Sequence, residues 1–206
     1  MNLKHSKSVL LGTSALVCLA LAAPLMADDF VITSSDGSTN GVGTTNGGTA
    51  AAIADTAING SHTVSLGIAL TTTAANEGIK TTGGTNKVTV SEAGSITTGT
   101  GDDAHGIYNR GNHNTTTVSG SIETSGYSAY GIYNIGNTNT TTVAGSIKTT
   151  GSTASGIYNL GSTNTTTVSG SITTAGSSAF GIRNNGDDNV TTVSGSIKTE
   201  GNNSHG

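Results

Sequence analysis

Histidines and paired aspartates are the side chains of this sequence best suited to metal binding or acid–base chemistry. Beyond the N-terminal His5 they are His62, His105, His113 and His205, with the pairs Asp102–Asp103 and Asp187–Asp188. A metal site needs at least two such side chains converging on one point. His105 and His205 stand at one position of a repeat but four repeats apart, roughly 19 Å at the spacing of stacked strands. Aspartate is also a common turn residue. The sequence therefore predicts exposed corner histidines, turn aspartates, no metal or cofactor site and no catalytic residue.

A row of tyrosines and a row of threonines are the other candidates, as surfaces that bind a partner. Tyr108, Tyr133 and Tyr158 recur at one repeat position, and strand alternation places them outward. Such a stripe could contact a ligand. It could instead line one side of the core, if the inward–outward alternation of side chains shifts by one residue after Ile107. The outward threonines are Thr115, Thr117, Thr140, Thr142, Thr165 and Thr167. Their Thr-x-Thr array resembles that of β-solenoid ice-binding proteins, although threonine is also an ordinary soluble strand residue and Val190 interrupts the array.

These side chains are carried by a repeat that recurs every 25 residues. Regular units begin at Gly106, Gly131, Gly156 and Gly181 and follow the pattern GIYNxGxxNTTTVSGSIxTxGxxAx. A degenerate unit spans residues 78–105, with Glu92 and Ala93 as an insertion. Repeats of this length are typical of solenoids, and units rich in glycine and threonine are poor helix formers. The sequence predicts an all-β fold, a parallel β-helix (β-solenoid) with about 25 residues per turn and two or three short strands in each turn.

Alternation along the strands predicts which side chains form the core. In the degenerate unit Val88 and Val90 face inward, so Thr116 and Val118 of the first regular unit, and Ile122 beyond them, face inward too. Stacked turns then align equivalent residues into columns of isoleucine, valine and alanine. Two columns of asparagine are expected to pair along the axis: Asn109, Asn134, Asn159 and Asn184, and Asn114, Asn139, Asn164 and Asn189.

The N-terminus reads as a secretory signal peptide over residues 1–27. Lys4 and Lys7 precede an apolar run from Val9 to Ala23, and a small-residue site ends at Ala27. Residues 28–77 are expected to form an irregular cap with imperfect turns, followed by repeats over 78–206. The chain stops one residue into a further unit, which predicts a truncated longer protein. The net charge of −4 predicts no nucleic-acid partner, and no transmembrane segment is expected after cleavage.

The combination of signal peptide, period and GIYNxGxxNTTTVSGSI units over residues 78–206 resembles the passenger regions of bacterial autotransporters (type V secretion). The resemblance implies a right-handed β-helix exported through the inner membrane and displayed at the outer membrane or released outside the cell. It also implies a C-terminal β-barrel of the same chain, which the sequence does not contain. The implied function is a non-catalytic stalk or adhesin that binds an unknown host or cell-surface ligand.

Three other functions compete with this interpretation. IYNIGNTN is loosely similar to the repeat of curlin-type secreted amyloid subunits of biofilm matrix, but those repeats use glutamine and this chain has none. The ice-binding array is the second alternative. The third is a β-helix enzyme acting on polysaccharides. Glycoside cleavage needs two carboxylates across a cleft, and uniform repeats offer no unit that breaks the pattern, so the sequence predicts that the chain is not an enzyme.

Overall fold

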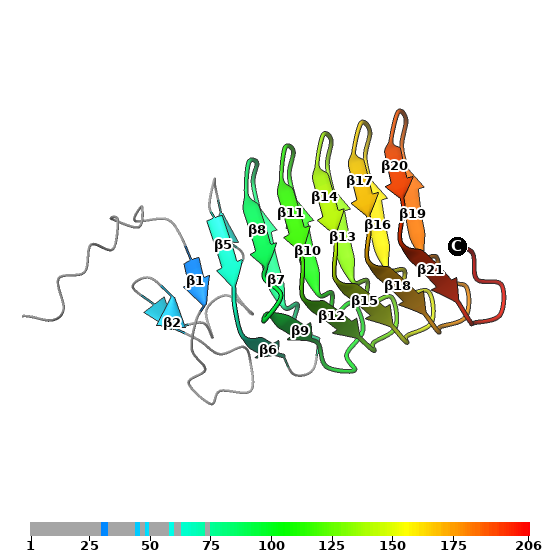
Figure 1. Cartoon of the computed structure of the whole chain (residues 1–206), viewed down its shortest axis with the longest axis horizontal. Coiled ribbons are helices and arrows are strands. Elements are labelled where there is room, and N and C mark those ends of the chain that lie inside the picture. The colour runs from blue at the N-terminus through cyan, green and yellow to red at the C-terminus, as the bar shows by residue number, and fades with distance from the viewer. Residues whose placement is uncertain (1–29, 33–43, 46–47, 50–57, 60–62, 73–74) are drawn as a thin grey trace, which may run out of the picture.

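The computed structural model of the 206-residue chain describes residues 30–32, 44–45, 48–49, 58–59, 63–72 and 75–206. The predicted signal peptide, His62 and much of the predicted cap lie outside these residues. The described chain is the predicted parallel β-solenoid, with three strands in each regular turn and the turns stacked along one axis (Figure 1). Within this part of the chain, none of the structure is a helix long and apolar enough to cross a membrane.

Three parallel sheets form the faces of the solenoid, and each receives one strand per turn. The Tyr sheet contains β4 (Ile58–Asn59), β7 (Ile79–Thr82), β10 (Ile107–Arg110), β13 (Ile132–Ile135), β16 (Ile157–Leu160) and β19 (Ile182–Asn185). The Thr sheet contains β1 (Phe30–Ile32), β5 (Thr63–Leu66), β8 (Lys87–Val90), β11 (Thr115–Val118), β14 (Thr140–Val143), β17 (Thr165–Val168) and β20 (Val190–Val193). The Ser sheet contains β6 (Ala69–Thr71), β9 (Ser95–Thr97), β12 (Ser121–Thr124), β15 (Ser146–Thr149), β18 (Ser171–Thr174) and β21 (Ser196–Thr199). Apart from these, β2 (Thr44–Thr45) and β3 (Gly48–Thr49) form an antiparallel pair.

Strand register follows the sequence repeat without slippage. Ile107 pairs with Ile132 in the Tyr sheet, and in the Ser sheet Ser121 pairs with Ser146. In the degenerate unit, the number of residues between paired positions of adjacent turns changes along the chain. It is 28 where Val88 pairs with Thr116 and 26 where Ser95 pairs with Ser121. This change confirms the two-residue insertion at Glu92 and Ala93. The insertion lies at a corner between β8 and β9, so it leaves both flanking strands in register.

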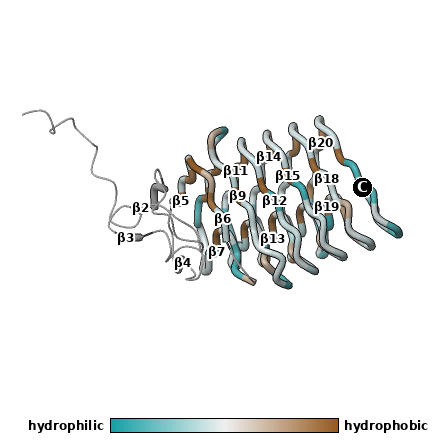
Figure 2. Tube along the Cα trace, turned by 90° about the horizontal axis from the view of Figure 1, so that it is seen from below, coloured by the Kyte–Doolittle hydropathy of each residue, from teal (hydrophilic) through white to brown (hydrophobic). Residues whose placement is uncertain are grey.

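The core is a set of aliphatic columns that run along the axis, as alternation predicts. Figure 2 shows apolar segments at the same place in successive turns. Thr116, Val118 and Ile122 are all buried, which confirms their inward assignment. The fully buried columns include Ile107, Ile132 and Ile157; Val118, Val143 and Val168; Ile122, Ile147 and Ile172; and Ala104, Ala129, Ala154 and Ala179. Each turn supplies few apolar side chains, so the polar ladders described next matter for stability.

Two buried asparagine columns connect successive turns, as predicted. In the first, Asn109 Nδ2 donates to Asn134 Oδ1 at 2.9 Å and to Thr116 Oγ1 at 2.9 Å. In the second, the backbone N–H of Asn114 donates to Asn139 Oδ1 at 2.8 Å. The side-chain nitrogens of Asn139 and Asn164 have no hydrogen-bond partner among the described residues. The first column therefore satisfies buried side chains, whereas the second mainly satisfies corner backbone.

Candidate functional site

Aromatic side chains gather on one outer edge of the solenoid. Four of the chain's five tyrosines meet there, in a protein with 3% aromatic residues and no tryptophan. We call this surface the aromatic patch; it comprises His105, Tyr108, Tyr130, Tyr133, Tyr158, Phe180 and Arg183. One half is the predicted tyrosine column on β10, β13 and β16. The other half comes from the corner residue just before each repeat glycine.

The tyrosine column faces away from the core. Ile107 and Asn109 are buried on either side of Tyr108, which is half-buried, and β13 shows the same alternation. The outward prediction is therefore correct, and the alternative that the column walls the core is wrong. Tyr158 is only 8% exposed, because neighbouring side chains cover it. One of these is Arg183, whose guanidinium carbon lies 4.8 Å from the ring centroid.

Ring contacts join His105 and the four tyrosines into one cluster, and Arg183, which lies over both Tyr158 and Phe180, links Phe180 to it. Tyr133 and Tyr158 stack with centroids 5.1 Å apart and ring planes 6° from parallel. Tyr130 meets both of these rings edge-on, at 5.1 Å and 5.2 Å. Tyr108 meets Tyr133 edge-on at 5.5 Å. These separations and angles are those that aromatic pairs prefer, so each ring helps to fix the orientation of the others.

His105 is where the structure corrects the sequence prediction. It was expected to be an exposed corner histidine, but its side chain is 5% exposed. The imidazole stacks on Tyr130 at 5.1 Å and on Tyr108 at 5.6 Å, and Nδ1 accepts the backbone N–H of Tyr130 at 3.1 Å. His113 and His205 are exposed, as predicted. The prediction failed because it considered each corner alone, without the aromatic neighbours that stacking brings from adjacent columns.

The surroundings of His105, Tyr130 and Tyr133 keep these three rings neutral at pH 7. Burial lowers the pKa of His105 to about 4, with Lys80 also lowering it and Glu77 opposing the shift. Burial raises the pKa of Tyr133 to about 12, and neighbouring phenols, Tyr158 first, add to this effect. Burial also raises the pKa of Tyr130. His105 is therefore an uncharged ring, and Tyr130 and Tyr133 are protonated phenols, which can donate hydrogen bonds.

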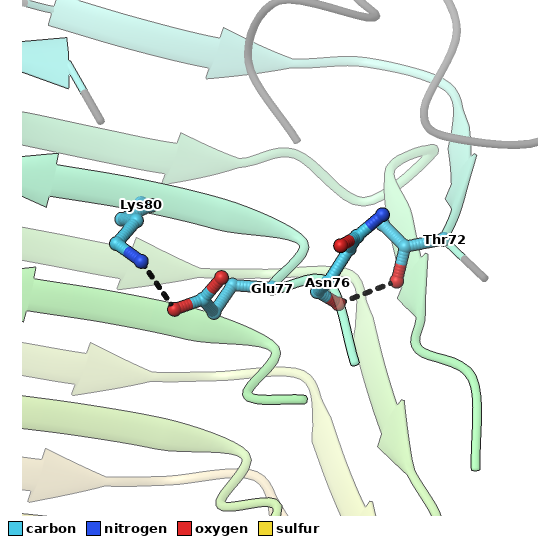
Figure 3. A network of polar contacts seen from close by, with 4 residues as sticks. All are labelled: Thr72, Asn76, Glu77 and Lys80. Carbon is cyan, nitrogen blue, oxygen red and sulfur yellow. Dashed lines mark hydrogen bonds and ion pairs between the residues drawn. The ribbon is translucent and has the colours of Figure 1, made fainter. Parts of the chain in front are cut away.

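A depression of about 420 Å³ lies over the patch. Its aromatic floor is formed by His105, Tyr108, Tyr130 and Tyr133, and its polar rim by Glu77, Lys80, Asp103 and Ser128. Lys80 Nζ donates to Glu77 Oε1 at 2.7 Å, and in Figure 3 this pair lies next to the Thr72–Asn76 hydrogen bond. Lys80 Nζ also lies 5.4 Å from the Tyr108 ring centroid. Polar groups thus provide most of the exposed lining, around the exposed ring atoms of the tyrosines.

The second hollow, of about 540 Å³, follows the corner between the Thr and Ser sheets. It is lined by serines and glycines such as Ser121, Gly145 and Ser146. A Cβ on Gly145 would lie 1.9 Å from the carbonyl oxygen of Gly120 one turn earlier, so the close approach of two turns requires glycine here. The hollow is explained by backbone packing, and the aromatic depression is the better functional candidate.

The threonine array and the aspartate pairs occupy the places predicted for them. The buried Thr116 alternates with outward Thr115 and Thr117, and β14 and β17 repeat this pattern with Thr140, Thr142, Thr165 and Thr167. Val190, which pairs with Thr165, is outward and 56% exposed. Asp103 and Asp188 adopt left-handed corner conformations, with φ of 58° and 55°. A binding role for the threonines stays a prediction.

Sequence reasoning missed half of the aromatic patch. Tyr130, Phe180 and the buried His105 escaped it because they occupy a corner, where the two-residue alternation of strands does not apply. A signal was present: the residue before the repeat glycine is His105, Tyr130, Ser155, Phe180 or His205. Across the described residues, no three His, Cys, Asp or Glu side chains are grouped to hold a metal ion.

Compared with known proteins, the chain matches no protein-family model, no curated protein and no solved structure.

Proposed function

We propose that the chain is a non-catalytic, surface-displayed β-solenoid, the stalk or adhesin part of an autotransporter-type secreted protein. The observation that supports this most is the unbroken register from β10 to β21, which repeats one three-strand turn without interruption. Such a solenoid gains length by adding turns and exposes the same side chains at regular intervals. This geometry suits extension and display.

The distribution of chemical groups supports the non-catalytic part of the proposal. Asp102 and Asp103 lie at a corner, where Asp103 adopts a turn conformation, and Glu77, the other carboxylate that lines the depression, is paired with Lys80. Outward positions of regular turns carry mainly threonine, serine and tyrosine. These side chains bind ligands through hydrogen bonds and ring contacts without requiring a reaction.

Display is tested by placing an epitope at the exposed corner of Tyr127, which is 56% exposed. The full-length gene is expressed, and antibody binding is compared between intact and permeabilised cells. We expect labelling of intact cells or of the medium, and loss of that labelling when residues 1–27 are deleted. Labelling that requires permeabilisation, with or without residues 1–27, would contradict the proposal.

A further inference from the structure

The depression over the aromatic patch has the composition of a small-ligand site. Tyr108, Tyr130 and Tyr133 are half-buried, so part of each ring still faces solvent. Glu77 and Asp103 place carboxylates at the rim, and Lys80 and Ser128 place donors there. The exposed lining of the depression is more polar than apolar, so it offers several hydrogen-bonding groups beside the exposed ring atoms, which suits a ligand rich in hydroxyl groups.

The floor of this depression is held in place before any ligand arrives. Tyr130 contacts His105, Tyr133 and Tyr158, with ring centroids 5.1–5.2 Å apart. The corner that carries Asp103 is fixed as well, because its backbone N–H donates to the carbonyl of Tyr127 at 2.9 Å. Rings and rim that are already ordered lose little entropy on binding, which favours affinity.

The charges around the depression argue against ionic ligands. Lys80 is paired with Glu77, which leaves Asp103 as the remaining charged group of the rim, and His105 is neutral. An anion would meet the Asp103 carboxylate. A cation would compete with the chain's own cations, since Lys80 already lies over Tyr108 and Arg183 over Tyr158. The site therefore suits an uncharged ligand that has both donors and acceptors around an apolar face.

We propose that the depression binds a neutral hexopyranose residue of a glycan. The C–H groups of a pyranose pack against the solvent-exposed ring atoms of Tyr130, and Tyr133, whose ring plane is turned by 70° from that of Tyr130, provides a second contact. Its hydroxyl groups donate to Asp103 and Glu77 and accept from Lys80 and Ser128. A neutral sugar would be the ligand class of the proposed adhesin. The biological role of this binding rests on the proposed surface display, whereas the binding itself does not.

The repeat supplies variants that should preserve the fold. Tyr130→Ser introduces the residue that stands at the same position one turn later, Ser155. Asp103→Asn introduces the residue that stands at the same corner position four turns later, Asn203. Tyr127→Ser matches Ser152 and is a control, because Tyr127 is exposed and makes no ring contact with the patch. Each variant is first checked for an unchanged circular dichroism spectrum and melting curve.

Binding is measured with the purified chain and methyl glycosides of glucose, galactose and mannose, together with their neutral oligosaccharides. Tyrosine fluorescence reports on the patch directly, because the chain has no tryptophan and four of its five tyrosines lie there. We expect saturable binding of at least one neutral sugar. Tyr130→Ser should weaken it about tenfold, the effect of losing one stacking ring. Asp103→Asn should weaken it severalfold, and Tyr127→Ser should leave it unchanged.

Several outcomes would overturn the inference. These are the absence of binding by every neutral sugar, equal binding by Tyr130→Ser and Tyr127→Ser, a preference for sialylated or sulfated sugars, or binding of a protein at the patch with no sugar binding. The assay uses soluble protein, so a failure of surface display would not affect its result. A failure to bind sugars would likewise leave the display experiment unchanged.

Discussion

His105 shows how stacking changes the character of a residue that looks ordinary in the sequence. Its Nδ1 accepts the backbone N–H of Tyr130, so protonation of that nitrogen would break a hydrogen bond as well as bury a charge. Glu77 is the facing group that favours the proton, and Lys80 opposes it. Burial outweighs Glu77, and the imidazole contributes to the patch as a neutral aromatic ring.

This environment predicts a pH dependence of stability. The folded pKa of about 4 lies below the ordinary value of 6.5, so between these values the unfolded chain binds a proton that the folded chain does not. The stabilisation is complete above pH 6.5 and is lost as the pH falls toward 4, by up to about 3 kcal/mol. Urea unfolding at pH 7, 5.5 and 4 measures it. His105→Tyr, which matches Tyr130, should remove this part of the pH dependence.

The control for that experiment is His113→Thr, an exposed corner histidine whose equivalent one turn later is Thr138. It should retain the full loss of stability toward pH 4. Identical pH profiles for the wild-type chain and His105→Tyr would show that His105 does not couple to folding. Carboxylates titrate in the same range, and the comparison between variants separates their contribution.

Individual residues also show what the sequence could predict about the candidate site. Tyr108 and Thr116 lie in strands, where alternation determines the facing of each side chain, and both were placed correctly. Tyr130 and His105 lie at a corner, where facing depends on how adjacent turns pack. The depression and its rim of Glu77 and Asp103 arise only when separate turns come together, so no local pattern could indicate them.

At the scale of strands, the asparagine ladder joins one element to the next. Asn134 accepts from Asn109 at 2.9 Å and donates to Thr141 at 3.0 Å and to Asn159 at 2.8 Å. It is buried, so each of these bonds is shielded from water. The sequence predicted this pairing because the period fixes which residues stack. The bond to Thr141, from β13 to β14 of the same turn, was not predicted, since it depends on how two faces meet inside the core.

Removing one member of this ladder should cost more than an ordinary surface change. Asn134→Ala removes one hydrogen bond from each of three buried partners, Asn109, Thr141 and Asn159, and we expect a loss of roughly 2–3 kcal/mol in the free energy of unfolding. Asn134→Thr should cost about 1 kcal/mol or less, because Thr81 occupies the equivalent position and its Oγ1 donates to Asn109 Oδ1 at 2.8 Å. Urea denaturation measures both, and equal stability of the two variants would argue against the ladder.

At the scale of the whole molecule, the solenoid tolerates extra residues at corners but not within strands. Glu92 and Ala93 enlarge one corner, and the flanking strands still pair in register. Within a strand, one extra residue would move each following side chain to the opposite face. The fold was predictable from sequence because the 25-residue period and the two-residue alternation of side chains indicate the same strands. In the 28-residue unit the period alone does not locate the extra residues, and the alternation was also needed to place Glu92 and Ala93.

Deleting whole turns tests this account of the fold. Removal of residues 117–141 takes out 25 residues and joins Thr116 to Thr142, which restores an intact NTTTV strand. The shortened protein should fold cooperatively and lose about 4.8 Å of length, measurable by small-angle X-ray scattering.

Removal of residues 117–140 is the matched variant, and it leaves one additional threonine inside the strand, so Val143 no longer faces the core. We expect this variant to unfold at clearly lower urea concentration. Equal stability of the two deletions would mean that β-strand alternation does not determine which side chains the solenoid buries.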